Sequence, residues 1–103
     1  MIWKNTVLKA LVEFVGYFAL KTGKRSFTAT LENREATVLD FLKQVEQAFV
    51  HSNLIVTEGV SLRSGVLIFH RKINGGTERI FDMNTILEEV NGHIIISTLM
   101  GGG

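Results

Sequence analysis

The clearest periodicity in the sequence lies in residues 37–50, where apolar side chains recur at the i, i+3, i+4 and i+7 spacing of one helix face. This apolar stripe consists of Val38, Phe41, Leu42, Val45, Ala48 and Phe49. The opposite, polar face consists of Asp40, Lys43, Gln44, Glu46 and Gln47. Thr37 is predicted to cap the helix, and Asp40 is placed to complete a capping box. A helix with a single apolar stripe must cover another apolar layer, so the pattern predicts a sheet beside it.

Strand patterns lie on both sides of this helix. Residues 9–17 are rich in valine and phenylalanine, and Ser26–Leu31 alternate polar and apolar side chains. With a turn at Thr22-Gly23-Lys24, they predict a first hairpin. After Gly65, the continuous apolar run Val66–Phe69 predicts a central strand that is buried on both faces or nearly so.

The last third of the sequence is divided by two turn signals. Asn74-Gly75-Gly76 predicts a turn before a short edge strand at Thr77–Phe81, and Asp82–Glu89 are predicted to hold a helical turn. Asn91-Gly92 predicts the turn before His93–Thr98, a β-branched final strand.

These elements predict a single domain over residues 1–98, with 1–6 frayed and 99–103 forming a flexible tail. The length of 103 residues suits one hydrophobic core. The predicted fold class is α+β: a β-grasp architecture, in which one main helix packs on a mixed sheet of four to five strands.

Composition excludes several classes of protein. A net charge of +1 gives no strong field for attracting nucleic acid or an acidic membrane, so neither is expected as a direct partner. The absence of cysteine excludes a disulfide framework, a thiolate zinc site and a cysteine nucleophile, and it fits a reducing compartment. No apolar stretch approaches the ~20 residues of a membrane span, and the N-terminal segment lacks a signal-peptide cleavage motif.

No catalytic or metal site is predicted. His51, His70 and His93 lie about twenty residues apart without metal-ligand spacing, so they are interpreted as unrelated surface or packing residues. Glu88 and Glu89 are adjacent and would point in different directions on a helix. Gly75-Gly76 lacks the frame of a phosphate loop, and no serine lies in a nucleophile elbow.

Basic side chains gather at two of the predicted turns. Lys21, Lys24 and Arg25 lie around the first, and Arg71 with Lys72 lies beside the second. Such clusters are most often ordinary solvated charges, and the alternative is contact with an acidic partner.

Three glycines, Gly101–Gly103, follow the final strand and contribute nothing to the stability of a fold. Either they are a frayed end, or a tail without side chains threads a narrow channel and presents its carboxylate to another protein. Residues 99–103 reach ~17 Å when extended.

A terminal carboxyl group has a pKa far below neutral pH, so its anion is a poor electrophile until ATP converts it to an acyl-adenylate. Sulfur would then give a thiocarboxylate and an amine would give an amide. Without cysteine or a phosphate loop, the chain would be a carrier rather than an enzyme.

Several segments resemble one known family. Residues 95–102 read Ile-Ile-Ser-Thr-Leu-Met-Gly-Gly, which resembles the Ile-Ser-Thr-Leu-His-Gly-Gly ending of the eukaryotic ubiquitin-related modifier family. Val12-Glu13-Phe14 with Gly16 resembles the first strand of that family, and Ser61–Ile68 resembles its Ser-Val-Arg-Pro-Gly-Ile-Leu-Val stretch. The likeness runs in register from Val12 to Gly102, and the ending is its most specific part. Met100, Ser64 and Asn91 depart from the family residues His, Pro and Asp.

The resemblance implies a monomeric, cytosolic protein with a ubiquitin-like β-grasp fold. It implies that an E1-like enzyme with a rhodanese domain binds the tail at Leu99, Met100, Gly101 and Gly102 and adenylates it with ATP, so that no cofactor is bound by the chain itself. The carboxyl of Gly103, or of Gly102 if Gly103 is not native, would become a thiocarboxylate. The sulfur would pass to tRNA thiolation enzymes for 2-thiolation of wobble uridine, and the same tail would be joined to lysines of target proteins.

Two alternatives remain open at this point. The small subunit of molybdopterin synthase is also a β-grasp sulfur carrier, but that family usually has prolines before Val-x-Gly-Gly, unlike the Ser97-Thr98-Leu99 sequence here. The other alternative is an interaction module with an inert tail, which would bind a partner through an exposed sheet face or edge.

Overall fold

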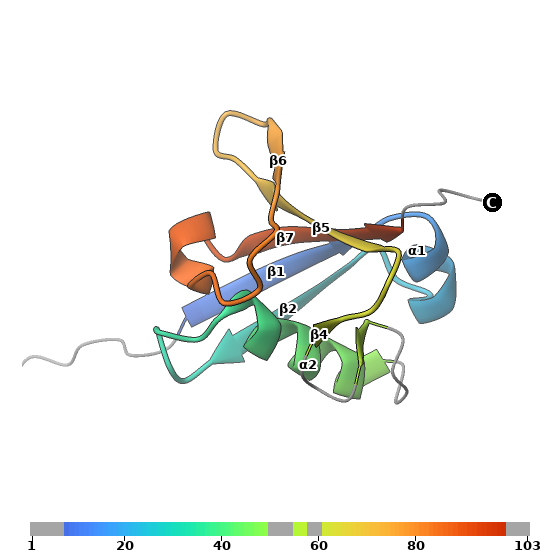
Figure 1. The fold of residues 1–103 in the computed structure, drawn as a ribbon, viewed down its shortest axis with the longest axis horizontal. Coiled ribbons are helices and arrows are strands. Elements are labelled where there is room, and N and C mark those ends of the chain that lie inside the picture. Colours follow the sequence, from blue (N-terminus) through green and yellow to red (C-terminus); the bar gives the residue numbers. More distant parts are fainter. Residues whose placement is uncertain (1–7, 50–54, 58–60, 99–103) are drawn as a thin grey trace, which may run out of the picture.

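The computed structural model of the chain describes residues 8–49, 55–57 and 61–98. Figure 1 shows its helices and strands in chain order. Their bounds are β1 (Leu8–Phe14), α1 (Tyr17–Thr22), β2 (Ser26–Leu31), α2 (Val38–Phe49), β3 (Val56–Thr57), β4 (Ser61–Leu62), β5 (Val66–Arg71), β6 (Thr77–Arg79), the 3-10 helix η1 (Leu87–Val90) and β7 (His93–Thr98). The predicted ends of the chain, residues 1–6 and 99–103, and the end of the predicted helix at Val50 lie outside the described residues.

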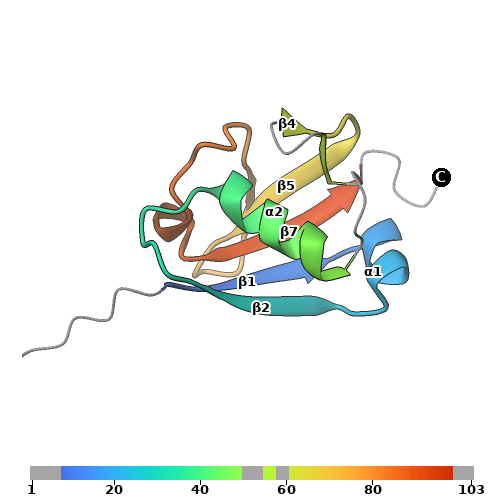
Figure 2. The same cartoon turned by 90° about the horizontal axis from the view of Figure 1, so that it is seen from below.

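A five-stranded mixed sheet forms the body of the protein, in the order β2-β1-β7-β5-β6. The two strands β1 and β7 pair in parallel, with Val12 opposite Ile94, and the other neighbours pair antiparallel. Helix α2 crosses one face of this sheet (Figure 2). The short strands β3 and β4, which the sequence did not predict, form a separate two-stranded ladder. The α+β, β-grasp prediction is therefore confirmed, with five strands in the main sheet.

Helix α2 begins at the predicted capping box. The backbone N–H of Thr37 donates to Asp40 Oδ2 at 2.9 Å, and the backbone N–H of Asp40 donates to Thr37 Oγ1 at 3.2 Å. These two bonds satisfy donors that have no partner inside a helix. Four apolar side chains of the predicted stripe are fully buried: Val38, Phe41, Leu42 and Val45.

The polar face of α2 departs from the prediction at its C-terminal end. Glu46 is only 9% exposed, and its Oε2 accepts a hydrogen bond from the backbone N–H of Ile55 at 2.7 Å. This bond gives the buried carboxylate a partner and ties α2 to the segment before β3. Ala48, which was predicted in the apolar stripe, is exposed, and the side chain of Phe49 lies outside the described residues.

The sheet face toward α2 forms the core. Alternate side chains of each central strand are buried there and pack with the helix stripe. From the sheet this cluster includes Ala10, Val12, Phe14, Ile68, Ile94 and Ile96. Burial of that many large side chains explains why a short chain without disulfides holds one fold.

The two strands of the predicted first hairpin are present, but the short helix α1 connects them, and the predicted tight turn at Thr22-Gly23-Lys24 is wrong. Strand β1 ends at Phe14, because Gly16 at φ 61° turns the chain into the short helix α1. Phe18 buries itself against the core, and Gly23 at φ 74° closes the helix instead of forming a tight hairpin turn. Strand β2 has the predicted bounds and pairs antiparallel with β1 as expected.

The central strand is β7 rather than the predicted Val66–Phe69 segment. Ile94, Ile95 and Ile96 of β7 are all buried, whereas Leu67 and Phe69 of β5 are only half-buried. Strand β5 lies one place from the edge because β6 covers it, and β6 is the predicted edge strand. The turn at residues 74–76 is confirmed, and the predicted helical turn in 82–89 is the slightly later η1.

Candidate functional site

The end of β7 is the place from which residues 99–103 continue, and it lies between β5 and the start of α1. Thr98 pairs with Val66 of β5 on one side. On the other side the backbone N–H of Val15 donates to the carbonyl of Ile96 at 3.0 Å. Strand β7 is therefore bonded on both sides as far as Ile96, and Thr98 pairs with β5.

The predicted site residues themselves, Leu99, Met100 and Gly101–Gly103, lie outside the described residues. Their role in binding an activating enzyme and the reactivity of the last carboxyl group stay predictions. What the structure contributes is their point of attachment, a strand end that is paired with β5 (Figure 1).

A charged cluster lies on the sheet face away from α2. The guanidinium of Arg71 donates to both carboxylate oxygens of Glu13, each at 3.2 Å. His93 Nε2 lies 2.6 Å from Glu13 Oε2. The cluster joins β1, β5 and β7, and the side chain of Glu13 is 30% exposed.

The hydrogen bonds from Arg71 hold the pKa of Glu13 below its ordinary value. Partial burial acts in the opposite direction, and the hydrogen bond with His93 adds to the lowering of the Glu13 pKa. No local pattern in the sequence predicts this cluster, because only the parallel register of β1 and β7 brings Glu13 beside His93. We interpret the cluster as structural, because its hydrogen bonds link the side chains of three neighbouring strands and so stabilise the middle of the sheet.

The substitution Glu13→Gln is expected to lower the free energy of unfolding by about 1 kcal/mol at neutral pH. A lowered folded-state pKa means that ionised Glu13 stabilises the protein above its unfolded-state pKa, and that this contribution is lost as pH falls through the folded-state pKa. The gap between wild type and variant should therefore shrink in acid. Urea denaturation across a pH series measures it.

Glu78→Gln is the matched control, since Glu78 Oε1 lies 3.9 Å from Lys72 Nζ and its side chain is 65% exposed. That change is expected to cost less than about 0.5 kcal/mol. A gap for Glu13→Gln that stays constant down to acid would contradict the assignment of the stabilisation to the ionised carboxylate.

The histidines and the adjacent glutamates considered in the sequence form no metal or catalytic site within the described residues. No group of three or more His, Cys, Asp or Glu side chains within residues 8–49, 55–57 and 61–98 is arranged to hold a metal ion. His93 contacts Glu13, His70 Nε2 is buried without a partner in the described part of the chain, and His51 lies outside it. Glu88 forms an ion pair with Arg34.

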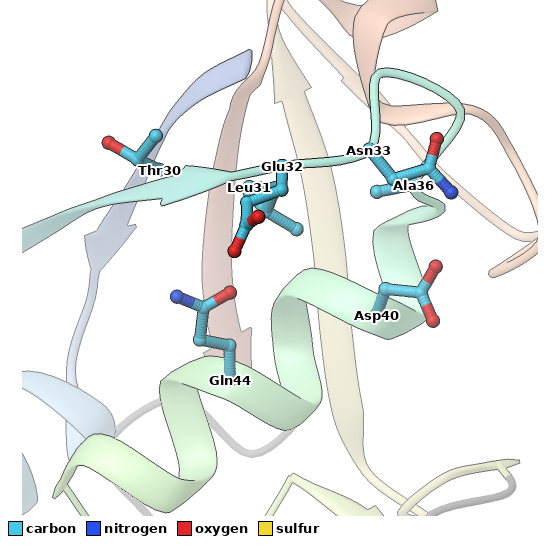
Figure 3. Close-up of a pocket in the computed structure, with 7 residues that line it drawn as sticks. All are labelled: Thr30, Leu31, Glu32, Asn33, Ala36, Asp40 and Gln44. Carbon is cyan, nitrogen blue, oxygen red and sulfur yellow. The ribbon is translucent and has the colours of Figure 1, made fainter. Parts of the chain in front are cut away.

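An open recess of about 420 Å³ lies between β2 and α2 (Figure 3). Its lining is mostly polar and consists of Thr30, Leu31, Glu32, Asn33, Ala36, Asp40 and Gln44. The side chains of Asp40 and Asn33 already accept backbone hydrogen bonds from Thr37 and Glu35. The recess offers no activated nucleophile among its lining residues, so we assign it no covalent chemistry.

Helices of the described segments are too short or too polar to cross a bilayer. The longest of them, α2, has 12 residues and a charged face.

Comparison with solved structures identifies the fold. SAMP1 from Haloferax volcanii superposes with a TM-score of 0.70 at 16% sequence identity, and the match covers 92% of this chain and 99% of SAMP1. The chain has a ubiquitin-like β-grasp fold. The Haloferax volcanii HVO 2177 protein is a second β-grasp match, with a TM-score of 0.63 at 13% identity over 100% of this chain and 93% of that one. No protein-family model matches the sequence, and no curated protein matches it.

Proposed function

We propose that this β-grasp protein is a ubiquitin-like carrier whose C-terminal glycine is activated by another protein. The observation that carries the proposal is that Gly101–Gly103 come two residues after the central strand of the sheet, β7, which ends at Thr98. A hydrogen-bonded strand end followed, after Leu99 and Met100, by three residues without side chains suits insertion of the last residues into a narrow active site. The likeness to SAMP1, a ubiquitin-like small archaeal modifier protein, supports the same function.

The chemistry proposed for the tail has two steps. A carboxylate oxygen of Gly103, or of Gly102 if Gly103 is not native, forms a bond to the α-phosphorus of ATP, and pyrophosphate leaves. Hydrosulfide supplied by a sulfur donor then attacks the acyl carbon, the bond from that carbon to the AMP oxygen breaks, AMP leaves, and a thiocarboxylate remains after loss of a proton. The chain contains no cysteine, so the sulfur must come from a partner.

The resemblance to the ubiquitin-related modifier family supports the finer details of the proposal. The activating enzyme is E1-like, carries a rhodanese domain and binds Leu99–Gly102. The sulfur serves 2-thiolation of wobble uridine in tRNA, and the same activated tail is joined to lysines of target proteins. We place this activity in the cytosol.

The test is to incubate the protein with ATP, a sulfur donor and the E1-like enzyme of the same organism. Intact-mass spectrometry is expected to show one terminal oxygen replaced by sulfur, and the C-terminal peptide identifies the residue that carries it. Omission of ATP is the control and should leave the mass unchanged. An unchanged mass in the complete reaction, with an enzyme active on its own substrate, would count decisively against the proposal.

The exposed edge of the sheet favours a second candidate, an interaction module with an inert tail. All three residues of β6 are exposed, and an edge strand presents backbone groups to which another strand can add. Such a module would keep its partner and its cellular role without the glycines, whereas a carrier would lose its activity.

A further inference from the structure

Helix α1 and its flanks expose apolar side chains that the fold does not use. Phe18 fixes the helix to the core, whereas Val15 and Tyr17 are nearly half exposed and Leu20 is 86% exposed. Single exposed apolar side chains are common on proteins. Here three of them lie within six residues of the chain, and a short helix holds them in place.

The same segment carries only positive charge. Lys21, Lys24 and Arg25 follow Leu20, and residues 15–25 contain no aspartate or glutamate. None of these three cations forms an ion pair with another residue of the described ranges. Arg71 and Lys72 at the other basic turn, by contrast, pair with Glu13 and Glu78. We call Val15, Tyr17, Leu20, Lys21, Lys24 and Arg25 the α1 surface.

The α1 surface lies at the end of the sheet from which the tail continues. The hydrogen bond from Val15 N–H to the Ile96 carbonyl joins its first residue to β7, and α1 packs beside the end of that strand. Figures 1 and 2 both show α1 at this end of β7. Residues 99–103 span at most ~17 Å, so an enzyme that holds the last glycine in its active site must face this end of the molecule.

We propose that the α1 surface docks the enzyme that activates the tail, with Leu20 entering an apolar recess whose rim carries carboxylates. The inference rests on the proposed function and adds a recognition surface that is separate from the tail. A central apolar anchor with a charged rim is the usual arrangement of a specific interface. The cations would steer the encounter, and Leu20 would slow dissociation.

The decisive variant is Leu20→Asp, with Ile73→Asp as its matched control. Ile73 is 90% exposed, but it lies in the β5–β6 hairpin, at the end of the sheet away from Thr98. Isothermal titration against the E1-like enzyme with ATP present is expected to show binding at least about tenfold weaker for Leu20→Asp. Ile73→Asp should bind within about twofold of wild type. Circular dichroism and thermal melting establish that both variants fold.

A second variant, Lys24→Glu with Arg25→Glu, tests the charged rim independently of Leu20. Its association rate should fall at low salt, and the difference from wild type should narrow as salt rises. Because both side chains are exposed, this variant keeps the inference testable even if Leu20→Asp does not fold.

The outcomes separate the inference from the proposed function. If both variants bind the E1-like enzyme as strongly and as fast as wild type, and their tails are activated normally, the inference is overturned and the proposed function still stands. Tight binding of wild type to tRNA alone at physiological salt, abolished by the Lys24/Arg25 variant, would also overturn it, because the cations would then serve a nucleic acid. Failure of wild type to be activated at all would overturn the proposed function.

Discussion

Removal of Gly101–Gly103 is expected to abolish sulfur transfer and lysine conjugation completely while leaving the fold intact. The deleted residues follow β7, and the buried cluster ends at Ile96 within that strand. The free energy of unfolding should therefore change by less than about 0.5 kcal/mol, as for surface changes elsewhere. Intact-mass spectrometry after activation measures the thiocarboxylate, and thermal melting measures the fold.

A C-terminal amide in place of the last carboxylate is the matched control for this truncation. It retains every residue and removes only the group that attacks ATP, so it should be as inactive as the truncated chain. The carrier function would be contradicted if either the truncated chain or the amide restored thiolated wobble uridine in cells that lack the original protein. If the truncated chain kept its partner and its cellular role, the interaction module would be favoured.

Gly92→Ala is expected to lower the free energy of unfolding by about 3 kcal/mol. Gly92 has φ +62°, where an L-residue costs about 1–2 kcal/mol. A Cβ there would also lie 2.7 Å from the backbone carbonyl oxygen of Lys9, so the start of β7 must move away from β1. That movement strains the hydrogen bond that Leu11 N–H donates to Gly92 O at 2.7 Å. Urea denaturation measures the loss.

Gly75→Ala separates the contact from the backbone strain. Gly75 also has a positive φ, +94°, but no atom lies within 4 Å of the position of its Cβ. This control should cost only about 1 kcal/mol, the strain of the left-handed region. Equal losses for the two variants would contradict the close approach of β1 and the start of β7.

Much of the fold was readable from local patterns. The capping box of Thr37 and Asp40 and the stripe at residues 38–45 act within one helix, so the sequence contains both. The β-branched run at 93–98 likewise predicted β7 with its observed bounds. Its central position was not predicted, because strand order depends on pairing between distant segments.

The errors lie where tertiary contacts override local preference. Residues 14–20 are apolar enough for a strand, but the backbone angle of Gly16 ends β1 and starts α1. Glu46 was expected in solvent, and only the return of the chain at Ile55 gives its carboxylate a buried donor. The Glu13 cluster depends on the parallel pairing of β1 with β7, which no short-range pattern encodes.

That pairing also orders the events of folding. The partners Val12 and Ile94 are separated by more than eighty residues, so the middle of the sheet cannot close until β7 has been synthesised. Contacts of such long range close slowly compared with helices and hairpins. The sheet therefore cannot be completed until β7 has left the ribosome. An enzyme that recognises the completed sheet would not act on nascent chains or on chains that lack β7.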